Sequence, residues 1–363
     1  MLIRTSSAPL PHVVRRRRHV ATRVGAAVIQ ASLLLTLSAC TDDAVTNPGT
    51  TPPESVVASV EYVGTRAVLY LDPGTTGRTK VTFSGATDPI PGNSPLVPAL
   101  VDANLLALGP LSWSPTGGKL AMVATVAFDQ SEVVVTSADG SAPRIASPNT
   151  QIILSAPDWS PDETQLAYAM STLQHARGVD LFVTNLATSQ VQRLTTGLDY
   201  SQTGGSVRFS SDGRFVFYSR PVAEGGAPLF DKTCEVWRIE VATGNRVRLA
   251  EKIAGTVQAI SRSGTWALVI RRTGVLASGD YDRALIRVPL AGTTAETTLI
   301  PSGRVQYARL TSDDLHAILA IDESTVPGTV AQTFRTLPSV GGAMTDVRGT
   351  GTQTVVADVH IPR

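Results

Sequence analysis

The chain has 363 residues, of which 42% are hydrophobic, 17% charged and 5% aromatic. It is long enough to bury a substantial core, and its low charged fraction excludes charge-driven disorder and long coiled coils. Residues 1–39 hold six of the 31 basic residues and no acidic one, so the rest of the chain carries 25 basic against 30 acidic residues, a net charge of −5. This mildly acidic body argues against nucleic acid as a partner.

The first part of the chain has the pattern of an export signal. Six arginines precede an apolar stretch at 24–37, which is shorter than the roughly 20 residues that a membrane-spanning helix needs. The stretch ends in Leu-Ser-Ala-Cys at 37–40, which resembles the lipobox of bacterial lipoproteins. That resemblance implies cleavage before Cys40 and diacylglycerol on its sulfur. The alternative is an ordinary secretory signal, which favours a small residue where Leu37 stands.

A polar, proline-rich segment follows and shows no periodicity, so we predict a flexible tether over residues 40–55. Two or three acyl chains on Cys40 would anchor the protein stably to a membrane. Thr41, rather than aspartate, follows the cysteine, and the lipoprotein resemblance then favours the outer membrane. We therefore expect a lipid-anchored monomer of the bacterial cell envelope, facing the periplasm.

The rest of the chain is built from repeats. A nine-residue unit starts at Trp113 (WSPTGGKLA), Trp159 (WSPDETQLA) and Phe209 (FSSDGRFVF), and weaker copies start at Ile260 and Leu310. The five copies are 46, 50, 51 and 50 residues apart. A second, glycine-containing or polar unit follows each copy, near residues 138, 187, 242, 291 and 340.

Both units have the composition of hairpin turns between strands, so each repeat predicts four strands, A to D. A period near 50 residues with four strands is typical of a propeller blade. The leftover segments 56–108 and 352–363 include strand-like runs at 67–71 and 355–359, which would complete a sixth blade. We therefore predict an all-β fold over residues 56–363, a six-bladed β-propeller of four-stranded blades closed by strands from both termini. Residues 84–98 are predicted to form a surface loop.

The pattern W-S-P-D-x-x-x-L-A resembles the TolB-like propeller repeat, a WD40-like repeat, over residues 105–345. The sequence departs from it at Thr116, at Arg262-Ser263 and at Ser312. The resemblance implies a propeller and an envelope location. TolB has an α/β domain before its propeller, whereas here a short tether precedes it, so the role of TolB is not carried over.

Sequence patterns for common catalytic centres are absent. The chain contains no G-x-S-x-G, H-E-x-x-H, paired C-x-x-C or Walker A pattern. Asp162 and Asp212 occupy the same turn position in two repeats, which favours a structural role, and Cys234 fits a buried hydrophobic position. We therefore expect no enzyme, no catalytic or metal-binding residue and no cofactor, although an ion in the central channel stays open as an alternative.

Loop lengths favour one face as a binding surface. The B–C interval varies most, with long loops predicted at 171–178, 220–233, 271–281 and 322–329. In a propeller these loops share a face with the D–A connections. We predict binding residues on this face, and the alternative is that they are ordinary solvated loop residues. The candidates are His175, Arg177, Arg220, Asp231, Lys232, Arg271, Arg272, Asp280, Asp322 and Glu323.

Such a mixed-charge surface suits protein recognition. We therefore predict a protein- or peptide-binding or scaffold module of the envelope. The alternative is a propeller enzyme or binder that acts on envelope or extracellular polysaccharide. Converging charged side chains and a bound ion in the central channel would favour that alternative.

Overall fold

The computed structural model describes residues 56–360, apart from 64–65, 73–76, 82, 84–106, 128–129, 149–151, 172–178, 197–205, 223–232, 277–278, 293–294, 324–331 and 348–353. The predicted signal peptide, Cys40, the predicted tether and the loop predicted at 84–98 lie outside these residues. Within the described part of the chain, no helix is long and apolar enough to cross a membrane.

Five consecutive segments of the chain each form one antiparallel sheet, and each sheet carries one copy of the repeat. Blade 1 consists of β4 (Ala107–Trp113), β5 (Lys119–Ala127), β6 (Gln130–Ser137) and β7 (Arg144–Ile145). Blade 2 consists of β8 (Ile152–Ile153), β9 (Asp158–Trp159), β10 (Gln165–Ser171), β11 (Val179–Asn185) and β12 (Val191–Arg193). Blade 3 consists of β13 (Val207–Phe209), β14 (Phe215–Pro221), β15 (Thr233–Glu240) and β16 (Arg246–Ala254).

Blades 4 and 5 follow the same order of strands. Blade 4 consists of β17 (Thr256–Ile260), β18 (Trp266–Val275), β19 (Tyr281–Pro289) and β20 (Thr297–Ile300). Blade 5 consists of β21 (Val305–Leu310), β22 (His316–Asp322), β23 (Gln332–Pro338) and β24 (Thr345–Asp346). In blade 2 the innermost strand is interrupted, so that its two parts, β8 and β9, both pair with β10. This sheet therefore has five strands, although it follows the four-strand order of the other blades.

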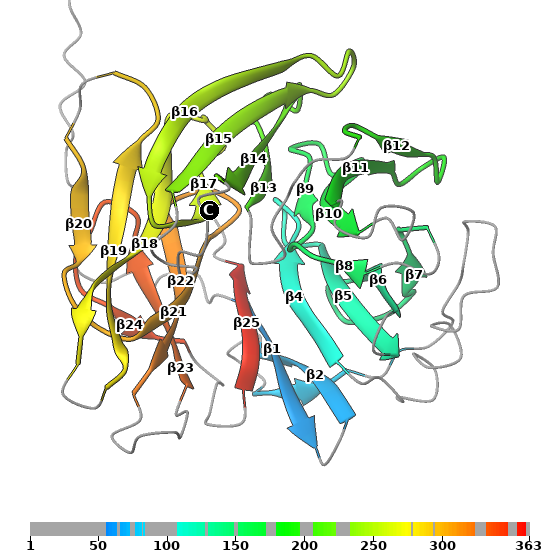
Figure 1. Ribbon diagram of the computed structural model, residues 1–363. Coiled ribbons are helices and arrows are strands. Elements are labelled where there is room, and N and C mark those ends of the chain that lie inside the picture. The colour runs from blue at the N-terminus through cyan, green and yellow to red at the C-terminus, as the bar shows by residue number, and fades with distance from the viewer. Residues whose placement is uncertain are drawn as a thin grey trace, which may run out of the picture. The chain divides into compact units, whose positions relative to one another are not determined.

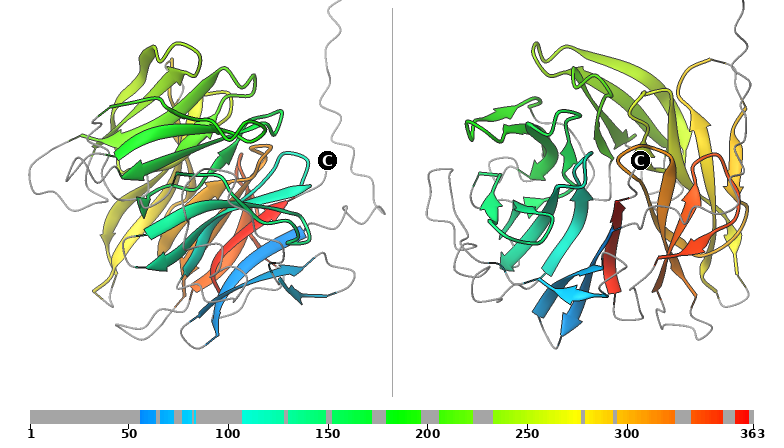
Figure 2. Two further views of the ribbon diagram at one scale, coloured as in Figure 1. Left: turned by 90° about the vertical axis from the view of Figure 1, so that its right-hand side faces the viewer. Right: turned by 180° about the vertical axis from the view of Figure 1, so that it is seen from behind.

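Both chain termini build blade 6. Its strand order is β25 (Thr354–His360), β1 (Val56–Val63), β2 (Arg66–Asp72) and β3 (Thr79–Lys80). The C-terminal strand is innermost, with Val359 opposite Val57, and it contacts β4 of blade 1 as well as β22 and β23 of blade 5. Figures 1 and 2 show β25, in red, beside the blue strand β1 and close to the cyan strand β4. The predicted six-bladed propeller and its closure by both termini are confirmed.

The A–B turns explain why the repeat contains serine or threonine at its second position. The hydroxyl of Ser160 accepts a hydrogen bond from the N–H of Gln165 at 2.9 Å, and the N–H of Ser160 donates to the carbonyl of Gln165 at 3.0 Å. The same pair of bonds occurs in the other four copies. The serine or threonine hydroxyl therefore adds a hydrogen bond to the backbone pairing of strands A and B where the turn begins.

The turn aspartates have the structural role predicted for them. Asp162 accepts the hydroxyl of Ser160 at 2.6 Å and the N–H of Thr164 at 3.1 Å. Asp212 makes the equivalent bonds with Ser210 and Arg214. The serine hydroxyl is the largest influence holding the pKa of each carboxyl below its usual value. These two carboxylates are therefore occupied inside their own turns.

The A–B and C–D turns lie together on one face of the ring, which we call the turn face. In blade 1 the N–H of Ala138 in the C–D turn donates to the carbonyl of Gly118 in the A–B turn at 3.0 Å, and blades 2 to 5 repeat this bond. The B–C loops and D–A connections form the opposite face, which we call the mouth face. His360 packs against Gly117, so β1, whose first residue pairs with His360, begins at the turn face.

Large side chains fill the spaces between blades. Trp159 is fully buried in a cluster with Leu166, Tyr168 and residues of blade 1, and its indole N–H donates to the carbonyl of Ser112 at 2.9 Å. Phe209 plays the corresponding part between blades 2 and 3. The anchor residue that opens each repeat thus stabilises the contact between successive blades.

Candidate functional site in the central channel

Charged side chains converge where the innermost strands meet. The residue just before each anchor is Asp158 in blade 2, Arg208 in blade 3 and Arg309 in blade 5, and Asp358 holds the matching register position in blade 6. These four residues are between 3% and 8% exposed. Because side chains alternate along a strand, anchor residues pack between blades while these residues point to the other side. This ring is absent from the binding residues predicted from the sequence.

Arg208 lies at the centre of the network. Its guanidinium contacts Asp158 at 3.4 Å and Asp314 at 2.6 Å, and it donates to the carbonyl of Thr311 at 2.6 Å. Burial alone would lower the pKa of Arg208, but the two carboxylates outweigh burial and raise it. Arg208 is therefore a charged cross-link between blades 2, 3 and 5.

Arg262 closes the turn-face side of the channel. This residue is one of the departures from the repeat, where it replaces proline. Its guanidinium donates to the carbonyls of Ser312 at 2.8 Å and Trp159 at 3.1 Å and contacts Asp158 at 3.4 Å. Its backbone N–H donates to Asp314 at 2.5 Å. The departure therefore supplies a side chain that ties blades 2, 4 and 5 together.

Asp358 and Arg309 form the loosest pair in the network. Asp358 accepts the N–H of Trp113 at 2.9 Å and lies 3.8 Å from the guanidinium of Arg309. Burial raises the pKa of Asp358, although Arg309 and backbone N–H groups oppose that shift. Tyr307 lies beside Arg309, and burial raises the pKa of its hydroxyl although the charge of Arg309 opposes that shift.

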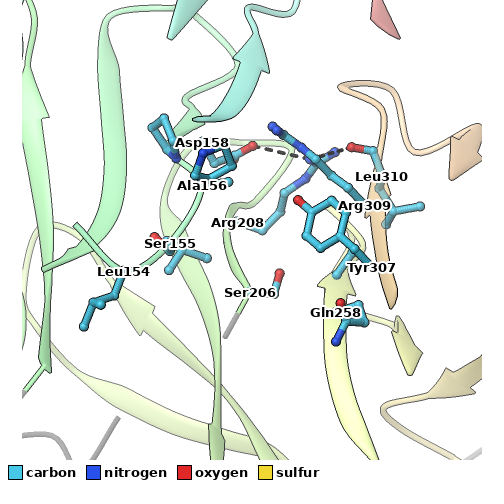
Figure 3. A pocket seen from close by; sticks show the side chains of 14 residues that line it. Leu154, Ser155, Ala156, Asp158, Ser206, Arg208, Gln258, Tyr307, Arg309 and Leu310 are labelled. Carbon is cyan, nitrogen blue, oxygen red and sulfur yellow. Dashed lines mark hydrogen bonds and ion pairs between the residues drawn. The ribbon is translucent and has the colours of Figure 1, made fainter. Parts of the chain in front are cut away.

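A cavity of about 120 Å³ lies against this network. Its polar lining comes from Asp158, Arg208 and Arg309, and from Tyr307, Gln258, Ser155 and Ser206. Figure 3 shows the labelled side chains surrounding this space. Most of the lining belongs to the beginnings of innermost strands, which follow the D–A connections, so the cavity lies on the mouth-face side of the ring.

Four of the ten predicted binding residues lie outside the described residues: His175, Arg177, Asp231 and Lys232. The structure corrects the placement of four others. Arg220, Arg271, Arg272 and Asp322 were predicted in loops but lie in strands β14, β18 and β22. The sequence interpretation ended these strands too early, because the paired strands continue as long hairpins past the buried core.

The described candidates all have partners within the propeller. Arg220 pairs with Glu235 at 2.8 Å, Arg271 with Glu296 at 2.8 Å and Glu323 with Arg335 at 2.7 Å. Arg272 lies over the ring of Tyr281, 4.1 Å from its centroid. Most of these contacts stay within one blade, so the ten residues do not form a single cluster.

Two of the candidates do come together at a second cavity, of about 250 Å³, between blades 4 and 5. Asp280 and Asp322 line it and both contact Arg304, at 2.5 Å and 3.6 Å. Tyr281, over which Arg272 lies, lines the same cavity and is 41% exposed. Sequence analysis missed Arg304, although its place in a D–A connection put it on the predicted face.

Carboxylates are engaged throughout both cavities. Asp158 accepts the N–H of Phe209 at 2.8 Å in addition to its arginine contacts. In the second cavity, Asp280 and Asp322 are both held by Arg304. Among the residues that the structure describes, no three histidine, cysteine or acidic side chains are grouped so that they could hold a metal ion. Cys234 is buried, as expected.

These features define a six-bladed β-propeller with a charged central channel. No protein family model matches the chain, and no curated protein matches it. It is similar in structure to TolB from Acinetobacter baumannii, with a TM-score of 0.58 and 14% identity over 86% of this chain and 68% of that one. A chain of the nidogen/laminin complex is also similar, with a TM-score of 0.51 and 8% identity over 84% of this chain and 97% of that one. At these identities the similarity shows the fold alone.

Proposed function

We propose that this protein is a lipid-anchored binding module of the bacterial cell envelope, which recognises a protein or peptide with its mouth face. The observation that carries the proposal is the pair of cavities on that face, one in the channel and one between blades 4 and 5, each of which has charged side chains in its lining. The nidogen/laminin structure is a complex between two proteins, which is the kind of role that we propose here.

The direction from which the chain enters the propeller supports this proposal. Strand β1 begins at the turn face, next to Gly117 and His360. The first described strand therefore starts on the turn face, and the mouth face with both cavities lies on the opposite side of the ring. A partner in the periplasm could then approach both cavities.

Binding is favoured over catalysis on polysaccharide by the state of the channel carboxylates. Glycoside hydrolysis needs one carboxyl group as an acid and a second as base or nucleophile. Asp158, Asp314 and Asp358 are instead held by arginines or backbone N–H groups. The convergence of charge in the channel is therefore explained by links between blades.

Lipid anchoring is tested by the variant Cys40→Ser. Only a thiol can form the thioether to diacylglycerol, so the variant should accumulate as unprocessed precursor and should not incorporate a clickable fatty acid. Cys234→Ser is the matched control, because Cys234 is the only other cysteine, and it should be labelled as strongly as the wild type. Labelling of the Cys40 variant would show that the anchor site is wrong.

The binding face is tested after capture of a partner from detergent-solubilised envelopes. The double variant Arg272→Glu with Tyr281→Ala should weaken binding at least tenfold, because an exposed aromatic residue beside an arginine is a typical interface hot spot. Leu315→Ala is the control, since Leu315 is 59% exposed in an A–B turn on the turn face. Affinity would be measured by surface plasmon resonance. Equal losses in the two proteins, or a loss in the control alone, would contradict the assignment.

A further inference from the structure

We propose that the channel cavity is a binding site for a carboxylate group, which Arg309 receives. This inference deepens the proposed function, because it names the chemical group that a partner would place in the channel. The same chemistry could be supplied by an acidic side chain, by a peptide C-terminus or by a free small carboxylic acid.

The three channel arginines differ in how closely protein acceptors approach their guanidinium groups. Arg208 contacts the Asp314 carboxylate and the Thr311 carbonyl at 2.6 Å, and Arg262 donates to carbonyls at 2.8 and 3.1 Å. For Arg309, the closest carboxylate among the described residues is that of Asp358, at 3.8 Å. A guanidinium has five N–H donors in a planar fork, so Arg309 has donors left for a ligand.

The cavity offers these donors together with other polar groups. Arg309 and Tyr307 line it beside the hydroxyls of Ser155 and Ser206 and the amide of Gln258. A carboxylate can accept two parallel bonds from a guanidinium, which is the strongest arrangement for this pair of groups. A volume of about 120 Å³ admits one such group with ordered water and excludes bulky ligands.

The charged residues around the cavity also favour a ligand that carries a single negative charge. Asp158 and Asp314 are neutralised by Arg208 and Arg262. Asp358 is the remaining counter-charge of Arg309, and its raised pKa shows that burial disfavours its charged form. An incoming carboxylate can therefore replace Asp358 as the partner of Arg309, whereas a cation would find each aspartate already engaged.

The test uses the full chain in detergent and titrates it with acetate, with acetamide as the uncharged isostere, by isothermal titration calorimetry. We expect acetate to bind at least tenfold more tightly than acetamide. Arg309→Gln should weaken acetate binding at least tenfold, while Arg214→Gln, which removes an exposed arginine of the turn face, should leave it unchanged. Equal binding of acetate and acetamide, or an unaltered affinity in Arg309→Gln, would overturn the inference.

A second variant separates ligand binding from a structural role of Arg309. Asp358→Asn removes the carboxylate that competes for Arg309 but keeps an oxygen that can accept the N–H of Trp113. This variant should bind acetate several-fold more tightly, whereas a purely structural pair predicts equal or weaker binding. The two variants should change the affinity for acetate in opposite directions, so Asp358→Asn still tests the inference if Arg309→Gln folds poorly.

The source of the carboxylate is distinguished by comparing three probes: a peptide with a free C-terminus and no acidic residue, an amidated peptide with one internal glutamate, and free glutarate. Tighter binding of inorganic phosphate than of all three would overturn the carboxylate assignment. Acetate binding needs no protein partner, so its failure leaves the mouth-face proposal standing. Loss of partner binding in the mouth-face variant with acetate binding retained would support both proposals.

Discussion

Replacing Arg208 with methionine is expected to destabilise the propeller by about 3–5 kcal/mol, the usual cost of removing one partner from a buried ion pair. Arg208 is 5% exposed and holds Asp158 and Asp314 from two other blades. Methionine fills a similar volume, so the loss reflects the uncompensated carboxylates and the carbonyl of Thr311 rather than a cavity. Urea unfolding followed by circular dichroism would measure the difference.

Arg214→Met is the matched control for this experiment. Arg214 lies in the same blade, and its side chain is 66% exposed and paired with Glu240 at 3.3 Å. Exposed ion pairs contribute between zero and about 1 kcal/mol, so this variant should unfold close to the wild type. Similar unfolding free energies for the two variants would mean that the channel network does not stabilise the contacts between blades.

The fold could be predicted from the sequence because the same local bonds recur in each blade. Ser160 and Asp162 make bonds that Ser210 and Asp212 repeat 50 residues later, so the turn chemistry leaves a visible period. Closure by both termini followed from the strand-like runs left over. The place of each terminal strand could not be predicted, because blade 6 lacks the A–B turn that marks the order of strands elsewhere.

The channel could not be predicted, because it depends on residues that differ from blade to blade. The position before the anchor is Asp158 in one blade and Arg208 in the next, and neither residue resembles the repeat consensus. Arg208 and Asp314 are 106 residues apart and meet only once the ring is closed. Departures from the repeat, such as Arg262, are the sequence signal of this network, but a departure alone does not indicate which side chains it contacts.

The mouth face was predicted only in part, for a related reason. The loop lengths correctly indicated that Asp280 and Asp322 lie on the mouth face, where both contact Arg304. It could not show that Arg271 extends from a strand to Glu296, because strand length beyond the core depends on pairing with the neighbouring hairpin strand. Charge alone therefore overestimated the number of side chains available to a partner.

Deleting residues 354–363 is expected to abolish the cooperative unfolding transition, or at least to lower the Tm by more than roughly 10 °C, given about 2–4 °C for each kcal/mol in proteins of this size class. The deletion removes the innermost strand of blade 6, which pairs with β1 and contacts blades 1 and 5. It also removes Val359 from its cluster with Val57 and Phe334, and Asp358 from the N–H of Trp113. Deletion of residues 361–363 alone is the control and should leave the Tm unchanged.

The specific contribution of this strand can be separated from a general effect of truncation by adding it back. A synthetic peptide with the sequence of 354–360 should raise the Tm of the truncated chain, because the vacated edge of β1 offers a full set of backbone partners. The same peptide with Val359→Asp should fail, since Val359 is 4% exposed and a carboxylate there would be buried without a counter-charge. Recovery with both peptides would mean that the edge accepts any strand. A Tm unaffected by the deletion would mean that the ring stays closed without β25.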